Sequence, residues 1–175
     1  MENQCTLSGN LVKLVPVAEE NMDFICEEET NADLWCYEEQ VETDKEKIRK
    51  KFTKNIGSEY RYDYVMKNSQ GELAGACYIW SIDKNRRSWE IGYVVLPQYR
   101  GKGYCKDSVH TLLRFAFSKL NAHKVIGMCN CENIASGMVM AKSGMSKQGV
   151  FRKEYLCHGK WTDQHYYSIL DEDQF

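Results

Sequence analysis

Residues 98–105 bring glycines, cations and amide donors together in a way that suits an anionic ligand. The segment reads, in order, Gln98, Tyr99, Arg100, Gly101, Lys102, Gly103, Tyr104 and Cys105. Glycine permits positive φ and lets other atoms come close to the backbone. If a helix begins here, its first amides have no partners inside the helix, and its dipole favours negative charge beside them. Because Arg100 and Lys102 add two cations, a phosphate or pyrophosphate is the natural ligand of this turn.

The residues on either side supply the strand and the helix that such a turn needs. Trp89, Ile91, Tyr93 and Val95 alternate as the residues on one face of a strand do. Pro97 has no amide hydrogen to donate, so the strand ends near it. Apolar residues with a helical period follow the turn: Val109, Leu112, Leu113, Ala116, Phe117 and Leu120. This spacing predicts an amphipathic helix that begins near Tyr104.

Glycine in this turn has a simpler explanation, and two known phosphate loops are excluded. A tight connection between a strand and a helix uses glycine whether or not a ligand binds. The dinucleotide-binding fingerprint requires a third glycine where Lys106 stands, and the P-loop requires a Gly-Lys-Ser/Thr ending that the sequence lacks. What remains is the pattern Gln98-x-x-Gly101-x-Gly103, with ATP as an alternative ligand.

The composition indicates one globular domain, residues 1–175. A chain of 175 residues with 43% hydrophobic and 27% charged residues is long enough to bury a core. Its net charge of -2 provides no basic face for nucleic acid. No apolar run reaches the length of a membrane span, and residues 1–10 have no signal-peptide pattern. We therefore expect a cytoplasmic protein without nucleic-acid or membrane partners.

The eight cysteines are expected to be free thiols rather than disulfides or metal ligands. Thiols stay reduced in the cytosol, and a buried free cysteine behaves as a small apolar residue. The closest pair, Cys129 and Cys131, lacks the spacing of zinc ligands and has no second pair to complete a site. No metal site is predicted.

Hydrophobic periodicity and turn residues divide the remaining chain into short strands and helices. Strands are expected at 10–15, 60–67, 72–82, 124–131, 151–157 and 165–170, and helices at 19–30, 43–57 and 134–144. Thr43 is the expected N-cap of the second helix, because Glu46 follows it with the spacing of a capping box. Residues 31–40 have no regular pattern. Helices interspersed among hairpins predict an α/β fold with a mixed sheet.

Motifs along nearly the whole chain resemble the GNAT N-acetyltransferases. The pattern Gln98-x-x-Gly101-x-Gly103 resembles their acetyl-CoA signature, Gln/Arg-x-x-Gly-x-Gly/Ala. A second run is similar to the RimJ/RimL-like branch, which contains the ribosomal-protein N-terminal acetyltransferases; it comprises Asn133-x-x-Ser136 and Lys142-x-Gly144-Met145. Further matching fragments, in the same order, are Leu7-x-Gly9, Val12-x-Leu14-x-Pro16, Glu90-Ile91-Gly92-Tyr93 and Gly159-Lys160-Trp161-x-Asp163.

This resemblance implies a fold and a place for acetyl-CoA. The family's sheet is mixed and mostly antiparallel, has about four flanking helices, and splays apart between its two middle strands. Pantetheine enters the splay and pairs with the strand edge as an added strand would. By the resemblance, Val94, Val95 and Leu96 make that contact and Asn133 reaches the pantetheine arm. The remaining cofactor contacts would be Gln98, Arg100, Gly101, Lys102, Gly103, Tyr104 and Cys105, with the amides of 101–105 on the pyrophosphate.

Asn133 and Glu90 can each have a functional or a purely structural role. Asn133 can cap the helix that begins at Ile134, with or without contacting a ligand. Glu90 is a carboxylate among core positions of the central strand, and such breaks in pattern often mark function. It could take a proton from an amine, directly or through water. Alternatively, Arg86, Arg87 or the backbone satisfies it in a structural role.

Ser136 is the second candidate catalytic residue, and its assignment depends on the resemblance. Many GNAT enzymes carry a tyrosine as general acid at the position of Met140, which cannot donate a proton. In the RimJ/RimL-like branch a serine near the sulfur is proposed instead, and Ser136 corresponds to it. The alternative is a serine in the first helical turn that bonds to nearby backbone.

Together these features predict an acetyl-CoA-dependent N-acetyltransferase that acts on a primary amine. The amine, of a protein N-terminus or a small molecule, would attack the thioester directly once positioned, and backbone N–H groups near Val95 would stabilise the oxyanion. The resemblance places the acceptor between residues 31–40 and the last hairpin. The alternatives are a small-molecule (polyamine or antibiotic) acetyltransferase and a non-catalytic CoA-binding module. A homodimer is possible.

Overall fold

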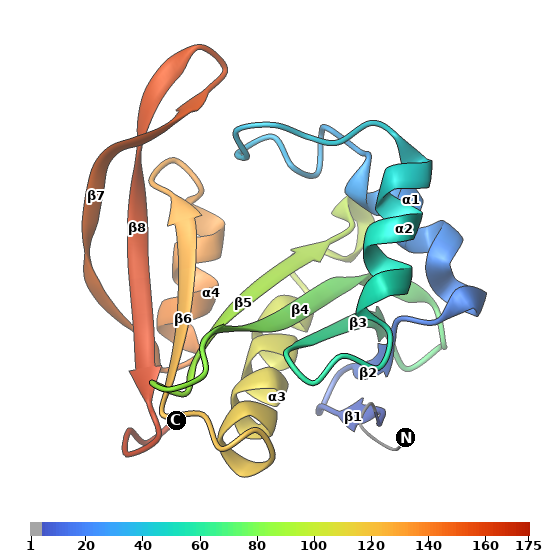
Figure 1. Ribbon diagram of the computed structural model, residues 1–175, viewed down its shortest axis with the longest axis horizontal. Helices are drawn as coiled ribbons and strands as arrows, with labels where there is room; N and C mark the ends of the chain where they lie inside the picture. Colours follow the sequence, from blue (N-terminus) through green and yellow to red (C-terminus); the bar gives the residue numbers. More distant parts are fainter. Residues whose placement is uncertain (1–4) are drawn as a thin grey trace.

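The computed structural model describes residues 5–175, which build one sheet of eight strands with helices on both faces (Figure 1). The strands are β1 (Leu7–Ser8), β2 (Lys13–Pro16), β3 (Arg61–Lys67), β4 (Leu73–Asp83), β5 (Ser88–Val95), β6 (Lys124–Asn130), β7 (Ser146–Cys157) and β8 (Lys160–Leu170). The α-helices are α1 (Met22–Glu29), α2 (Lys45–Asn55), α3 (Tyr104–Ser118) and α4 (Ile134–Lys142), and single 3-10 turns cover Glu19–Asn21 and Pro97–Tyr99.

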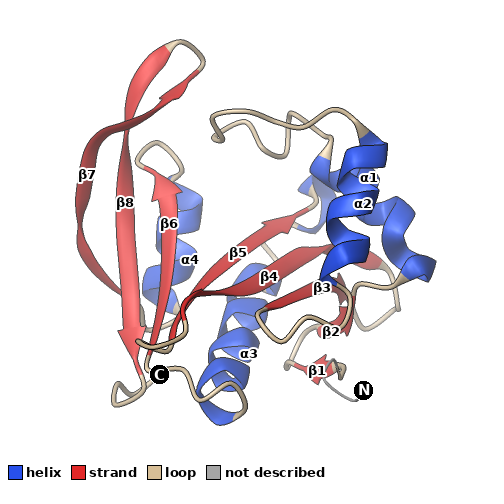
Figure 2. Cartoon of the chain, viewed as in Figure 1, coloured by secondary structure: helices blue, strands red, loops and turns tan. Residues whose placement is uncertain are grey.

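The strand order is β1-β2-β3-β4-β5-β6-β8-β7, and within residues 5–175 every neighbouring pair is antiparallel except β5 with β6 (Figure 2). A parallel pair needs a crossover, and α3 provides it. This is the mixed, mostly antiparallel sheet that the sequence predicts, with four α-helices in the described residues.

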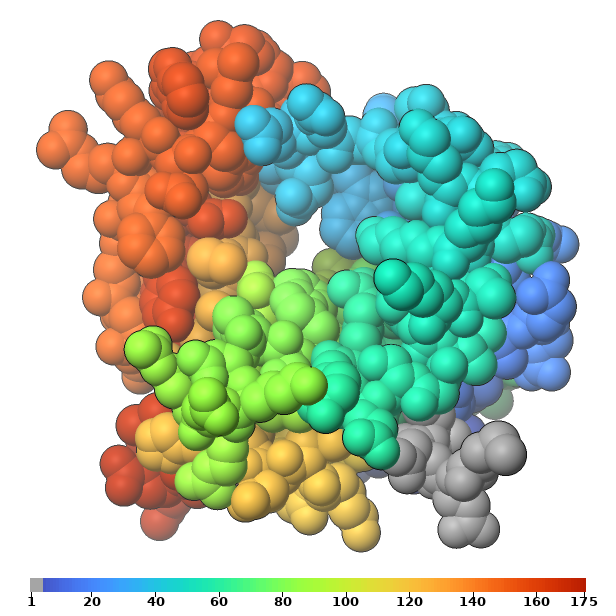
Figure 3. All heavy atoms as spheres, in the orientation of Figure 1, coloured from blue at the N-terminus to red at the C-terminus, as the bar shows by residue number. Residues whose placement is uncertain are grey.

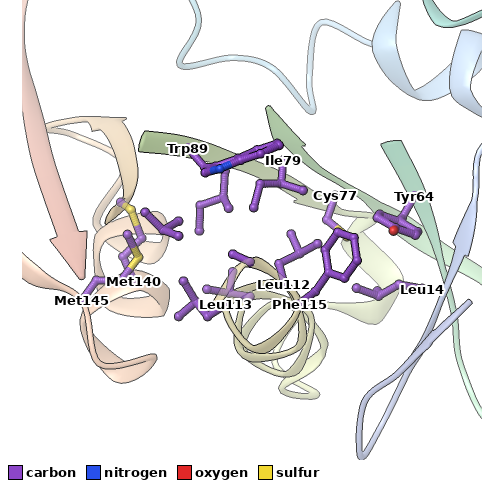
Figure 4. Close-up of a cluster of buried hydrophobic side chains, with 14 of the residues drawn as sticks. Leu14, Tyr64, Cys77, Ile79, Trp89, Leu112, Leu113, Phe115, Met140 and Met145 are labelled. Atoms are coloured by element: carbon purple, nitrogen blue, oxygen red, sulfur yellow. The ribbon is translucent and has the colours of Figure 1, made fainter. Parts of the chain in front are cut away.

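The alternation of side chains along the central strands separates two cores. On one face, Trp89, Ile91 and Val95 of β5 pack with the apolar stripe of α3 and with Met140 of α4. Figure 4 shows Trp89 above Leu112 and Leu113 of this stripe, with Met140 beside them. On the other face, Val94 packs with residues of α1 and α2. Leu112 and Leu113 of α3 are fully buried, as the predicted helical stripe requires.

β5 and β6 separate after a short parallel contact. They pair at Ser88↔Lys124, Trp89↔Val125 and Glu90↔Ile126. Beyond that point β5 runs on to Val95, still paired with β4, and β6 runs on to Asn130, still paired with β8. Residues 91–95 of β5 and residues 127–130 of β6 are therefore not paired with each other. We call the gap between these two strand edges the wedge.

Most predicted elements are confirmed, and the differences are local. The N-cap of α2 is Asp44 rather than Thr43, since the Asp44 carboxylate accepts hydrogen bonds from the amides of Glu46 and Lys47. The first predicted helix opens with a 3-10 turn, and the last two strands are longer than expected. β1 has only two residues and no sequence signal. None of the helices described over 5–175 combines the length and apolarity needed to span a bilayer.

Candidate active site

The wedge leaves polar backbone groups of two strands facing each other without a ladder. On the edge that faces away from the gap, β5 is paired with β4 and β6 is paired with β8. The gap is therefore part of the sheet and not a frayed strand end. Val94 and Val95 are buried, and the Leu96 amide bonds back to the carbonyl of Ala74 at 2.9 Å. Unpaired strand edges of this kind accept an extended chain by strand addition.

The glycine turn lies where β5 ends and α3 begins, beside the wedge (Figure 1). Gly101 and Gly103 have φ of 76° and 83°, and Gly103 is the N-cap of α3 in the left-handed conformation. A Cβ at Gly101 would meet no atom within 4 Å, so this face of the backbone is open. Within residues 5–175, the amides of 101–106 donate no backbone hydrogen bond. Six free amides with Arg100 and Lys102 alongside fit a diphosphate.

Glu90 lies on the face of β5 opposite to the core formed with α3 and α4, and it lines a cleft of about 440 Å³. Other cleft residues come from β3, from β4, from α2, from the end of α1 and from the segment between α1 and α2; they include Glu29, Trp35, Glu38, Glu42, Lys51, Arg61, Tyr78 and Trp80. Trp80 pairs directly across from Glu90 and Tyr78 across from Gly92. The predicted base therefore points into a real cavity, next to the wedge. Arg86 and Arg87 do not line this cleft.

Burial raises the pKa of Glu90 to about 7, a hydrogen bond from the Trp80 side chain opposes that rise, and the charge of Glu38 adds to it. Burial also raises the pKa of Glu38, and Glu29 contributes. A carboxyl that titrates near neutral pH can both accept and release a proton under ordinary conditions. The cleft thus supplies the environment that a general base requires.

The hydroxyl of a buried tyrosine beside this cleft, Tyr78, contacts two further carboxyl groups, those of Glu28 and Glu29. The Tyr78 hydroxyl lies 3.0 Å from Glu28 Oε2 and 2.9 Å from Glu29 Oε1. Tyr78 is the donor in both contacts and has one proton for the two carboxyl groups. Burial, and then Glu29, raise the pKa of Glu28 well above its usual range, and the hydrogen bond from Tyr78 opposes that rise.

A backbone segment closes the cleft from above, and we call residues 35–38 the roof. Asn130 Nδ2 and the Tyr155 hydroxyl donate to the Tyr37 carbonyl at 3.2 and 3.1 Å. His158 Nε2 lies 2.8 Å from the Cys36 carbonyl. These bonds connect the α1–α2 segment to β6 and to the β7–β8 hairpin, and Figure 3 shows the opening that remains beneath. The structure brings together the two regions in which the acceptor is expected.

Asn133 and Ser136 lie at the start of α4, on the β6 side of the wedge. The Asn133 side chain accepts a hydrogen bond from the Ser136 amide at 3.1 Å, so its capping role is confirmed. Ser136 is half-buried, and its hydroxyl lies 3.0 Å from the hydroxyl of Tyr93. Tyr93 belongs to β5 and donates to the Ser136 carbonyl at 2.9 Å. This pair is a polar side-chain contact across the wedge.

Met140 lies in the core rather than at the wedge. It is fully buried, and its sulfur fills the place that a Cβ on Gly127 would take, 2.6 Å from that position. The helix side chain at this position therefore offers neither a proton nor access to a ligand. No hydroxyl from α4 other than Ser136 is available in its place, since the helix reads Ile-Ala-Ser-Gly-Met-Val-Met-Ala-Lys.

The predicted cofactor residues divide into three groups in the structure. Val94, Val95 and Leu96 form the β5 edge of the wedge, and Asn133 stands across from them after β6. Residues 100–105 form the turn and first helical residues, with Cys105 half-buried and the glycines exposed. Gln98 lies in the 3-10 turn between the two and is exposed.

Sequence reasoning missed Tyr93, Tyr78 and Asn130 as residues of the site. Tyr93 alternates with Trp89, Ile91 and Val95, so its spacing indicated core, and only its hydroxyl contact reveals more. Tyr78 and Asn130 are ordinary strand residues by pattern. Their partners lie 49 or more positions away in the chain, which no local signal encodes.

Comparison with known proteins agrees with this geometry. A family model described as an acetyltransferase (GNAT) domain matches residues 12–146. The uncharacterized N-acetyltransferase YnaD of Bacillus subtilis is 40% identical over 86 residues, which are 49% of this chain and only 51% of that protein. A spermidine N(1)-acetyltransferase of Vibrio cholerae is 24% identical over 145 residues, 82% of this chain and 83% of that protein.

Solved structures show the same fold. A GNAT-family acetyltransferase from Bacillus anthracis superposes with a TM-score of 0.85 at 25% identity, covering 97% of this chain and 100% of that one. The Vibrio cholerae spermidine N-acetyltransferase, crystallised with CoA and spermine, gives 0.86 at 22% identity, covering 93% and 97%. Since the family model covers most of the chain and the two central strands part after Glu90, ahead of the glycine turn, the protein belongs to the GNAT acetyltransferase family.

Proposed function

We propose that this protein transfers the acetyl group of acetyl-CoA to a primary amine by direct attack, and that residues 1–175 form a single acetyltransferase domain. The observation that carries the proposal is the continuity of three features. The free amides of the glycine turn, the unpaired edges of the wedge and the cleft containing Glu90 follow one another along β5. A ligand with a diphosphate, an extended arm and a reactive end would occupy all three.

The residues of this chain fit such a ligand. The amides of Gly101, Lys102, Gly103, Tyr104 and Cys105 would bind the diphosphate, assisted by the cations of the turn. Arg100 and Gln98 flank the path from the turn to the wedge. Val94, Val95 and Leu96 would pair with the amide groups of the pantetheine arm as a neighbouring strand does, with Asn133 on the opposite side.

Glu90 would then act as the base. The thioester supplies an activated acyl group, so the chain needs no nucleophile of its own. Glu90 takes the proton of the bound amine as its nitrogen forms the new bond, and an amide near Val95 donates to the developing oxyanion. Because the pKa of Glu90 is about 7, the charged base is available near neutral pH.

Ser136 would assist the departing sulfur. Its hydroxyl stands at the α4 side of the wedge, where a hydrogen bond to the thiolate becomes stronger as negative charge grows. No proton transfer from the serine is required, because a thiol is already acidic enough to leave as thiolate. The core position of Met140 excludes that residue from this role.

The acceptor remains a choice between two classes of amine. A protein N-terminus would suit the RimJ/RimL-like branch, to which a putative ribosomal N-acetyltransferase of Bacillus subtilis, 28% identical over 103 residues, also points. A polyamine is the second candidate, supported by the carboxylates of the cleft and by the spermidine N-acetyltransferases among the relatives. Mass spectrometry of a panel of peptides, polyamines and aminoglycosides incubated with acetyl-CoA distinguishes these, and tight CoA binding without turnover would identify a non-catalytic module.

Gly103→Val tests the diphosphate assignment. A β-branched side chain at φ 83° strains the turn and covers the amides, so we expect CoA affinity to fall at least 100-fold in calorimetry. Gly57→Val is the matched control, because Gly57 also has a positive φ, 78°, and open surroundings, but follows α2 and is not part of the turn. Equal CoA affinity in the two variants would reject the assignment, and ATP binding as tight as CoA binding would favour a nucleotide-binding protein.

A further inference from the structure

Tyr93 makes a contact that its core position does not require. It lies on β5, within the stretch that is paired with β4 but not with β6, and its ring packs against the core that β5 shares with α3 and α4. A phenylalanine would fill the same apolar space. The hydroxyl, however, reaches across to α4 and contacts Ser136 twice, at the carbonyl (2.9 Å) and at the side-chain oxygen (3.0 Å).

Counting donors and acceptors in this pair shows that the Ser136 hydroxyl can still donate one hydrogen bond. A carbonyl can only accept, so the 2.9 Å contact is a donation by Tyr93. In that state the tyrosine oxygen accepts from the Ser136 hydroxyl. If a negative charge forms in the wedge, the Ser136 proton turns toward it, and the Tyr93 proton can turn from the carbonyl to the serine oxygen. Each hydroxyl stays bonded throughout, and the chain of two bonds strengthens the donor that faces the charge.

Other groups near this pair do not supply the same function. Burial keeps the pKa of Tyr93 far above neutral, so the phenol stays protonated and acts only as donor or acceptor. The Cys129 thiol also contacts the Ser136 side chain, but burial raises its pKa to about 11, so it carries no charge at neutral pH. Asn133 is occupied with the Ser136 amide.

We propose that Tyr93 is a positioning residue that holds the Ser136 hydroxyl toward the sulfur of a thioester bound in the wedge, and this inference rests on the proposed function. The amine nitrogen forms the new bond to carbon, the carbon–sulfur bond breaks, and the amine proton goes to Glu90. The thiolate leaves with its electron pair and is stabilised by the Ser136 O–H. Tyr93 touches neither substrate and acts through the serine.

The test is the preference of the protein for CoA over desulfo-CoA, which lacks the sulfur. At pH 9, where much of the CoA thiol is ionised, calorimetry of the unmodified protein should give tighter binding of CoA. Tyr93→Phe should reduce that preference roughly 3- to 10-fold, the usual effect of one hydrogen bond to a polar partner, while desulfo-CoA binding is unchanged. Tyr167→Phe, a second tyrosine beside α4, is the matched control and should keep the preference.

Ser136→Ala separates failure of this inference from failure of the proposed function. If Ser136→Ala abolishes the preference and Tyr93→Phe does not change it, Ser136 acts alone and our inference is wrong. If Ser136→Ala itself has no effect, the role proposed for the serine fails first. In the Ser136→Ala background, Tyr93→Phe should have no further effect on the preference or on kcat. If Tyr93→Phe lowers kcat in the Ser136→Ala background as much as it does in the parent, Tyr93 acts only by joining β5 to α4.

Discussion

At the residue scale, the surroundings of Glu90 explain how a carboxyl group on a central strand acquires a pKa suited to proton transfer. Its neighbours on the same face of β5 are Ser88 and Gly92, so nothing bulky covers it on that strand. Trp80 contacts it from the paired strand, and the roof brings Glu38 near it. Desolvation on one side and access to the cleft on the other raise its pKa without burying it out of reach.

The first prediction concerns the pH profile. Since Glu90 must be charged to accept a proton, kcat should rise with pH through about 7 and then level off. Glu90→Gln should lower kcat by roughly 10²- to 10⁴-fold and remove this limb. Glu38→Gln should keep activity and move the limb to lower pH, because one like charge is removed. A Glu90→Gln enzyme that retains the limb would eliminate Glu90 as the base.

The stability of Glu90→Gln shows whether lost activity is lost folding. Folding raises the pKa of this carboxyl, so its charged form disfavours the folded state above about pH 7. That penalty is absent below the ordinary pKa, where the group is protonated in both states. Thermal melts should therefore show Glu90→Gln more stable than the parent at pH 8 and equal to it near pH 4.

At the element scale, α3 is attached to the chain's beginning as well as to the sheet. The Asp107 carboxylate accepts hydrogen bonds from the amides of Asn10, Leu11 and Val12, at 3.0, 2.8 and 3.0 Å. Gly9 is necessary beside it, since a Cβ there would lie 2.2 Å from Asp107 Oδ2. Three amides on one carboxylate hold residues 9–12 against the helix that carries the glycine turn.

Asp107→Ala should therefore cost far more stability than its half-exposed position suggests. We expect a loss of roughly 2–4 kcal/mol in the free energy of unfolding, because three amides lose a charged acceptor. Asp23→Ala, which removes an exposed ion pair with Arg49, should cost less than about 1 kcal/mol. Urea titrations of both variants provide the comparison, and similar losses in the two would contradict this account.

The sequence allowed the central β5–turn–α3 unit to be predicted closely, because alternation, glycine and helical period all change within a few residues. It was less informative for β7, whose side chains are almost all exposed and so show no face. The N-cap of α2 was placed one residue early because Thr43 and Asp44 both suit that role. The roof and the Tyr93 contact depend on pairs distant in the chain, and no periodicity predicts them.

At the scale of the whole molecule, the sheet is two units joined by a narrow contact. One consists of β1 to β5 with α1, α2 and α3, the other of β6 to β8 with α4, and the parallel pairing of β5 with β6 covers only three residue pairs. The apolar core shared by β5, α3 and α4, the roof and the Tyr93–Ser136 pair also connect them. The wedge between them is thus open to a chain-like ligand while these contacts join its two sides.

Hydrogen exchange with two ligands tests this arrangement. CoA should slow exchange at the glycine turn and along both wedge edges, residues 91–96 and 127–130, whereas adenosine 3′,5′-bisphosphate, which has no pantetheine arm, should protect the turn at most. At 100 times its Kd, CoA should also raise Tm by roughly 5–10 °C. If CoA protects the turn but leaves both wedge edges exchanging freely, the arm lies elsewhere, and neither Glu90 nor Ser136 would meet the thioester.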